Sequence, residues 1–165
     1  MIHVNPADMQ ASANVMDLYM QAIKNLEVLH RRLLDLVKDA LEREHILDIT
    51  PNQALMLYNI GDRQLSVTEL RSQGAYTGTN ASYNVKKLIE AGLLCHSRGR
   101  MDRRTALLSL GQEGQKVRDV VAKVYEKHAQ TVVQLGGVGE NDFLTMNKTM
   151  NRLDRFWSDH IEYKM

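Results

Sequence analysis

Four arginines lie close together in one short stretch, "SRGRMDRRT" (residues 97–105): Arg98, Arg100, Arg103 and Arg104. Guanidinium groups are permanently charged and bind phosphate or carboxylate oxygens through paired hydrogen bonds. The whole chain is almost neutral, with 21 basic and 20 acidic residues, so this cluster is a local feature. It is either a solvated surface loop or a local binding site for an anion, and the elements around it decide between the two.

Composition sets the broad class of the protein. At 165 residues, with 44% hydrophobic and 25% charged residues, the chain is expected to form one soluble globular domain, or one domain with helical extensions. It has no apolar run near the roughly 18 residues that span a bilayer. The first residues, "MIHVNPADMQ", lack the basic and apolar regions of a secretory signal. A single cysteine excludes an internal disulfide, which fits a cytoplasmic location. A membrane partner is not expected.

The first element that must position the arginines is a long helix. Between Asp8 and Glu44 the apolar positions recur at steps of three and four, which is the spacing of one helix face. A helix of this length in a small domain often packs partly against something outside its own domain. The stripe consists of Met16, Tyr19, Ile23, Leu26, His30, Leu33, Val37 and Leu41.

A second helix has clear start and stop signals. Thr50 is an expected N-cap, Pro51 suits the first helical position and Gln53 can complete a capping box. The helix is expected to end at Gly61.

Two shorter helices, Ser66–Gln73 and Thr79–Ala91, are predicted next, joined by the small-residue turn "GAYTG". Ser66 is the expected cap of the first, with Glu69 three residues later. This order is typical of a helix-turn-helix. The second helix is expected to bury Ala81, Val85, Leu88 and Ile89.

The arginines connect two predicted strands. "LLCHS" and "TALLSL" read as the arms of a hairpin whose tip is the arginine stretch, and Cys95 is expected to be a small buried residue of the first arm. Helical spacing returns at Gly114, with the apolar stripe Val117, Val121, Val124, His128, Val132 and Leu135. "GGVGEND" interrupts it, and a last helix follows with a seam pattern at Phe143, Met146, Met150, Leu153 and Trp157.

From Asp102 the chain reads Asp-Arg-Arg, three residues, Leu-Ser-Leu, then "GQEG" to Gly114. This resembles the wing signature of the MarR (multiple antibiotic resistance regulator) family, and "VKKLIEAGLL" resembles the end of that family's recognition helix. One departure is Gly111, which stands where threonine or serine usually caps the next helix; another is the long, glycine-rich "GAYTGT". The resemblance implies a mainly α, winged helix-turn-helix fold. It divides the chain into dimerisation (1–48), DNA-binding (49–112) and dimerisation (113–165) regions.

The resemblance also assigns roles to the arginines. It implies that Arg104 enters the DNA minor groove, that Asp102 orients it, and that Arg98, Arg100 and Arg103 bind flanking phosphates. The predicted recognition helix exposes polar residues suited to a duplex, with a merely solvated face as the alternative for each of them. They are Thr79, Asn80, Ser82, Tyr83, Asn84, Lys86 and Lys87.

The expected function is a cytoplasmic, sequence-specific transcriptional repressor that binds double-stranded DNA as a homodimer. The dimer surface is expected to include Met16, Phe143, Met146, Met150, Leu153, Phe156 and Trp157. By the resemblance, a small aromatic or phenolic effector binds between the dimer helices and the DNA-binding lobe. The candidate residues are Tyr19, Ile23, His30, Met56, Tyr58 and Tyr76, each of which can equally be ordinary core.

Other chemistry finds no support in the sequence. His30 and His128 lie on apolar stripes and are expected to pack in the core, and the six histidines lack metal-ligand spacing, so neither metal nor cofactor is expected. Nucleotide-binding glycine loops and a hydrolase elbow are missing, so an enzyme is not expected. Two alternatives stay open: an architectural DNA-binding protein of low specificity, which the net charge of +1 disfavours, and a helical adaptor with a vestigial wing.

Overall fold

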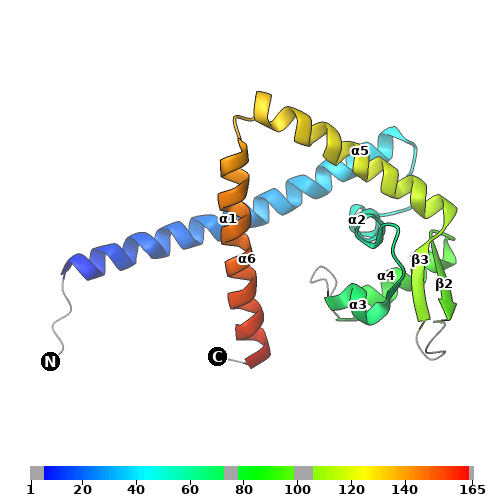
Figure 1. Ribbon diagram of the computed structural model, residues 1–165, viewed down its shortest axis with the longest axis horizontal. Coiled ribbons are helices and arrows are strands. Elements are labelled where there is room, and N and C mark those ends of the chain that lie inside the picture. The colour runs from blue at the N-terminus through cyan, green and yellow to red at the C-terminus, as the bar shows by residue number, and fades with distance from the viewer. Residues whose placement is uncertain (1–5, 73–77, 99–105, 164–165) are drawn as a thin grey trace. The chain divides into compact units, whose positions relative to one another are not determined.

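The computed structural model describes residues 6–72, 78–98 and 106–163. The chain divides into two compact units, Met1–Ala122 and Lys123–Met165. The elements in chain order (Figure 1) are α1 (Pro6–Arg43), α2 (Pro51–Ile60), β1 (Leu65–Ser66), α3 (Val67–Ser72), α4 (Gly78–Glu90), β2 (Leu94–Arg98), β3 (Ala106–Leu110), α5 (Gln112–Leu135) and α6 (Glu140–Tyr163). The predicted mainly α fold with a small hairpin is confirmed. None of the described helices has the length and apolar character needed to cross a bilayer.

The predicted capping box of α2 is present. The Oγ1 of Thr50 accepts a hydrogen bond from the backbone N–H of Gln53 at 3.3 Å, and the Thr50 N–H donates to the Oε1 of Gln53 at 2.9 Å. Two of the N–H groups that a helix start leaves unpaired are thereby satisfied. At the other end, the N–H of Gly61 donates to Leu57 from a backbone with φ of 58°. Both boundaries of α2 follow from residues within one turn of them.

The first helix of the helix-turn-helix, α3, is capped in the same way. The N–H of Glu69 donates to the Ser66 Oγ at 3.1 Å, and the Ser66 N–H donates to Glu69 Oε2 at 2.7 Å. The hydrogen bond from the Ser66 backbone, followed by that from its hydroxyl, lowers the pKa of the Glu69 carboxyl from its usual range.

This lowered pKa predicts a pH dependence. Because the folded pKa lies below the unfolded one, the contribution of Glu69 is fully present above about pH 4.3 and is lost as the pH falls through the folded pKa. Glu69→Gln keeps an acceptor oxygen at every pH, so its stability should fall less steeply on acidification. Urea unfolding of both proteins between about pH 6 and about pH 3 measures this, and parallel curves would contradict the prediction.

The sheet has three antiparallel strands in the order β1-β3-β2. In the predicted hairpin, Leu94 pairs with Leu110 and Arg98 pairs with Ala106, while the connection 99–105 lies outside the described residues. The short strand β1 was not predicted. It pairs Leu65 with Leu108, and two residues are too few for a strand period to show in the sequence.

The hydrophobic core of the first unit contains residues from α1 at one end of the unit to α5 at the other. Helix α1 contributes only the C-terminal part of its stripe, because Met16 and Tyr19 are exposed. The buried apolar residues are Val37, Leu41, Ala54, Met56, Leu57, Ile60, Leu65, Leu70, Ala81, Val85, Leu88, Leu93, Leu94, Leu108, Val117 and Val121. The core therefore joins α1, the helix-turn-helix, the hairpin and the start of α5.

Three predicted burials are wrong. Cys95 is exposed because side chains alternate along β2 and its neighbour Leu94 occupies the core face. His30 and His128 are exposed too, and the residues within one turn of each along its helix are not buried either.

Two glycines bring the start of α5 against the chain before β2. The N–H of Gly111 donates to the Leu93 carbonyl at 2.9 Å, and a Cβ at Gly111 would lie 2.5 Å from the Gly92 carbonyl oxygen. A Cβ at Gly114 would lie only 2.0 Å from the Leu93 oxygen. This contact explains why glycine replaces the threonine or serine that the resemblance leads one to expect at position 111.

The second unit contains the end of α5 and all of α6. Gly139 immediately precedes α6; its N–H donates to Asp142 Oδ2 at 2.8 Å, and its carbonyl accepts from the Phe143 N–H at 3.2 Å. Among the residues that the structure describes in this unit, no side chain is buried. Phe143, Met150, Leu153 and Trp157 are half-buried, whereas Phe156 is 61% exposed.

Candidate nucleic-acid interface

Helix α4 has one apolar and one polar face. Ala81, Val85 and Leu88 follow each other at steps of four and three and are buried, and the helix contacts α3 and β2. Ile89, predicted to be buried with them, is only half-buried. The core thus fixes which side of α4 is turned to solvent.

The solvent side carries groups suited to a polyanion. Ser82, Tyr83, Lys86 and Lys87 are all exposed, as predicted. The Lys87 Nζ lies 5.9 Å from the centroid of the Tyr83 ring, and the Lys86 Nζ lies 3.8 Å from Glu90 Oε1. Exposed pairs of this kind are weak, so both ammonium groups can turn to phosphate oxygens at little cost.

Asn84 lies apart from these residues, at the edge of the buried face. It is half-buried, and its Oδ1 accepts a hydrogen bond from the Nε2 of Gln53 at 3.2 Å. Gln53 is the residue that closes the capping box of α2. Sequence reasoning missed this contact, because the two residues are 31 positions apart and no local pattern relates them.

The β2–β3 hairpin stands on the same core through Leu94 and Leu108, which are 2% and 1% exposed. Its last described pair joins Arg98, the first arginine of the stretch, to Ala106, the residue that follows the stretch. Arg100, Asp102, Arg103 and Arg104 lie outside the described residues, as do the side chains of Arg98, Thr79 and Asn80. Their assigned roles remain predictions.

A long-range ion pair, also missed, ties α5 to the turn after α2. Arg118, 24% exposed, donates to Asp119 at 2.9 Å and to Asp62. These hydrogen bonds, with Asp119 first and then Asp62, raise the pKa of Arg118, so it stays charged at any pH of interest. Within the described residues, no group of His, Cys, Asp and Glu is arranged to hold a metal ion.

The sequence of this region matches a known protein family. Residues 47–105, which run from before α2 to the end of the hairpin connection, match the model of the MarR family. This segment belongs to the MarR family. The protein is therefore a DNA-binding transcriptional regulator and not an enzyme.

Individual relatives and solved structures are similar to this protein over most of its length. The exopolysaccharide II synthesis transcriptional activator ExpG of Rhizobium meliloti is 28% identical over 161 residues, covering 96% of this chain and 81% of its own. Staphylococcus aureus MarR, solved with salicylate and kanamycin, is 22% identical with a TM-score of 0.68, covering 90% and 98% of the two chains. Streptococcus pneumoniae FabT, solved with DNA, is 18% identical with a TM-score of 0.68, covering 86% and 98%. The structures establish the fold.

The candidate effector residues of this MarR-family protein differ in their surroundings. Met56 is completely buried in the core, Tyr58 and Ile23 are half-buried, and Tyr19 is 39% exposed. His30 is exposed, and Tyr76 lies outside the described residues. Met56 therefore has the environment of an ordinary core residue, and the effector role of the set stays a prediction.

Proposed function

We propose that this regulator binds a near-palindromic operator as a homodimer, with α4 in the major groove and the β2–β3 hairpin at the minor groove. The observation that carries the proposal is the polar face of α4, which the core turns outward while the same core supports the two strands that flank the arginine stretch. A two-fold dimer places two such units about 34 Å apart, one turn of B-DNA.

Dimerisation is supported by the second unit. Its described side chains form no buried core, and a helix of α6's composition gains most of its stability from packing. Large apolar residues lie exposed there and on the N-terminal half of α1, and a second copy would cover them. They include Val15, Met16, Leu18, Met20, Leu144, Met146, Phe156, Ile161 and Tyr163.

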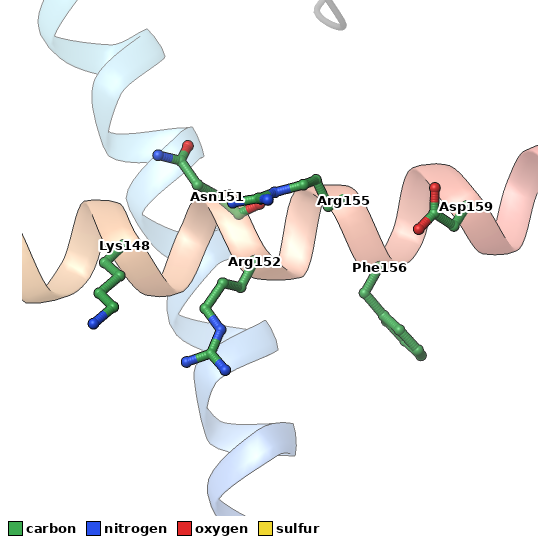
Figure 2. A pocket seen from close by; sticks show the side chains of 6 residues that line it. All are labelled: Lys148, Asn151, Arg152, Arg155, Phe156 and Asp159. Atoms are coloured by element: carbon green, nitrogen blue, oxygen red, sulfur yellow. The ribbon is translucent and has the colours of Figure 1, made fainter.

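Figure 2 shows how α6 presents its surface. Lys148, Arg152 and Phe156 project from one side of the helix, whereas Asn151, Arg155 and Asp159 project from another. These six residues line an open hollow of about 690 Å³. Phe156 also stacks on His160, with 6.2 Å between the ring centroids. The helix surface thus offers apolar and charged groups of both signs to a partner helix.

Leu153→Glu tests the dimer. Leu153 lies on the predicted seam of α6 and is half-buried in the single chain. Because a two-fold interface contains each residue twice, the substitution should raise the dimer dissociation constant about 100- to 1000-fold. Sedimentation equilibrium measures this, with Ser158→Glu as the matched control, because Ser158 is exposed on α6 and lies outside both the seam and the hollow. Equal dimer masses for the two variants would contradict the proposed seam.

The operator proposal is tested by selection from a pool of random duplexes. Sequence-specific binding predicts enrichment of a near-palindrome whose affinity clearly exceeds that of the pool at moderate salt. Equal binding to all duplexes that disappears with salt would indicate an architectural protein, and no binding even at low salt would leave the adaptor hypothesis. The near-neutral chain, with a net charge of +1, disfavours the architectural protein.

Effector control and the direction of regulation form the last part of the proposal. Staphylococcus aureus MarR, a structural neighbour, is described in complex with salicylate, which supports a small phenolic acid as the effector here. Such a ligand would release DNA by binding the DNA-free conformation of the protein more tightly. Salicylate titrated into the complex with the selected operator tests this, and an unchanged affinity for the operator would contradict it.

The direction of regulation is tested separately. Repression is our hypothesis, whereas the relative named an activator supports activation. A reporter gene behind the selected operator decides between them.

A further inference from the structure

A chain of hydrogen bonds connects the start of α2 to the recognition helix. The backbone N–H of Thr50 donates to Gln53 Oε1 at 2.9 Å, and Gln53 Nε2 donates to Asn84 Oδ1 at 3.2 Å. Gln53 and Asn84 are both half-buried, and the bond between them is partly shielded from water. The first link is local, whereas the second joins two helices.

The Thr50 N–H fixes which atom donates and which accepts in each of these hydrogen bonds. A backbone N–H can only donate, so the Gln53 amide must turn its oxygen toward Thr50 and its NH₂ group toward α4. Asn84 must then turn its oxygen toward Gln53. Its own NH₂ group, which carries two donor hydrogens, is left on the side away from α2.

We infer that Gln53 is a specificity-positioning residue, which orients the Asn84 amide so that Asn84 offers hydrogen-bond donors to the DNA. This inference rests on the proposed insertion of α4 into the major groove. Gln53 itself touches no DNA in this scheme and acts only through Asn84.

The orientation of the amide has a consequence for base choice. An asparagine that reads adenine in the usual way needs its oxygen for the adenine N6 amino group and its nitrogen for N7. In this protein the oxygen is engaged by Gln53. The remaining donors suit guanine, whose O6 and N7 are both acceptors, or thymine, which presents O4. Adenine offers N7 alone, beside an amino group that the Asn84 oxygen is not turned to meet. Asn84 therefore selects guanine or thymine at the position that it contacts.

Gln53→Glu reverses the polarity without removing the cap. Glutamate at this position of a capping box still accepts from the Thr50 N–H. Its second carboxylate oxygen cannot donate, so Asn84 must rotate its NH₂ group toward α2 and turn its oxygen to the DNA. The preferred base should then change from guanine or thymine to cytosine or adenine, which present amino groups.

Asn52→Asp is the matched control. Asn52 is the exposed neighbour of Gln53 in the first turn of α2, and the substitution adds the same negative charge. It should weaken binding to all duplexes alike and leave base preference unchanged. Urea unfolding of each variant shows whether α2 keeps its stability.

The experiment selects bound duplexes from a random pool with the wild type, Asn84→Ala, Gln53→Glu and Asn52→Asp. Asn84→Ala should flatten the preference at one position of each half-site, and Gln53→Glu should change the ratio of guanine or thymine to cytosine or adenine there by about tenfold or more. The inference is overturned if Asn84→Ala lowers affinity equally for all sequences, or if Gln53→Glu behaves like Asn52→Asp. Failure of the proposed function looks different, because the wild type itself would then enrich no sequence.

Discussion

Replacing Gly114 by alanine is expected to lower the free energy of unfolding by about 2–3 kcal/mol. The added Cβ would lie 2.0 Å from the backbone carbonyl oxygen of Leu93, a distance that requires the backbone to move. Leu93 is itself buried and its carbonyl accepts from Gly111, so neither partner can move without disturbing the core. The better helix propensity of alanine, at most about 1 kcal/mol, does not offset this overlap.

Urea unfolding measures the effect, with Gln115→Ala as the control. Gln115 is the next residue of α5 and is exposed, so its replacement should change stability by less than about 0.5 kcal/mol. Similar unfolding midpoints for Gly114→Ala and Gln115→Ala would show that the contact between α5 and the chain before β2 does not constrain the fold.

Arg104→Ala is expected to weaken operator binding about 10- to 100-fold without changing stability. If the side chain lies in a narrow minor groove, its loss removes one desolvated charge contact there. The slope of log affinity against log salt should also fall by about one charge. Fluorescence anisotropy at several salt concentrations measures both quantities on the selected operator.

Arg43→Ala is the matched control for charge. Arg43 ends α1 and is exposed, where it pairs with Asp39 at 2.8 Å. The substitution removes the same formal charge at a position distant in sequence from the arginine stretch. The affinity for the operator should therefore change by less than about twofold. If Arg104→Ala binds as tightly as Arg43→Ala, the hairpin is not a DNA probe, and the vestigial wing of the adaptor hypothesis becomes the better interpretation.

The helix caps, the turn after α2 and the hairpin strands could be predicted from the sequence. The capping boxes at Thr50 and Ser66, the turn at Gly61 and the two arms of the hairpin all occur where they were predicted. Each depends on residues within about one helical turn or on a simple strand period, and the same rules operate in any fold. The family resemblance then supplied the order in which these parts assemble.

Burial and long-range contacts depended on the tertiary structure. Cys95 and Leu94 are adjacent apolar residues of one strand, and only the packing of β2 on the core decides that Leu94 is inside. The close approach of Gly114 to Leu93 and the bond from Gln53 to Asn84 join segments that no local pattern relates.

From its sequence alone this protein was recognisable as a winged helix-turn-helix of the MarR type with an arginine-tipped hairpin. The tertiary structure decided which side chains those elements bury and how the Asn84 amide is turned. The physical reason is that secondary structure and caps arise from neighbours in the chain, whereas burial and amide orientation are set by whichever distant segment packs against them.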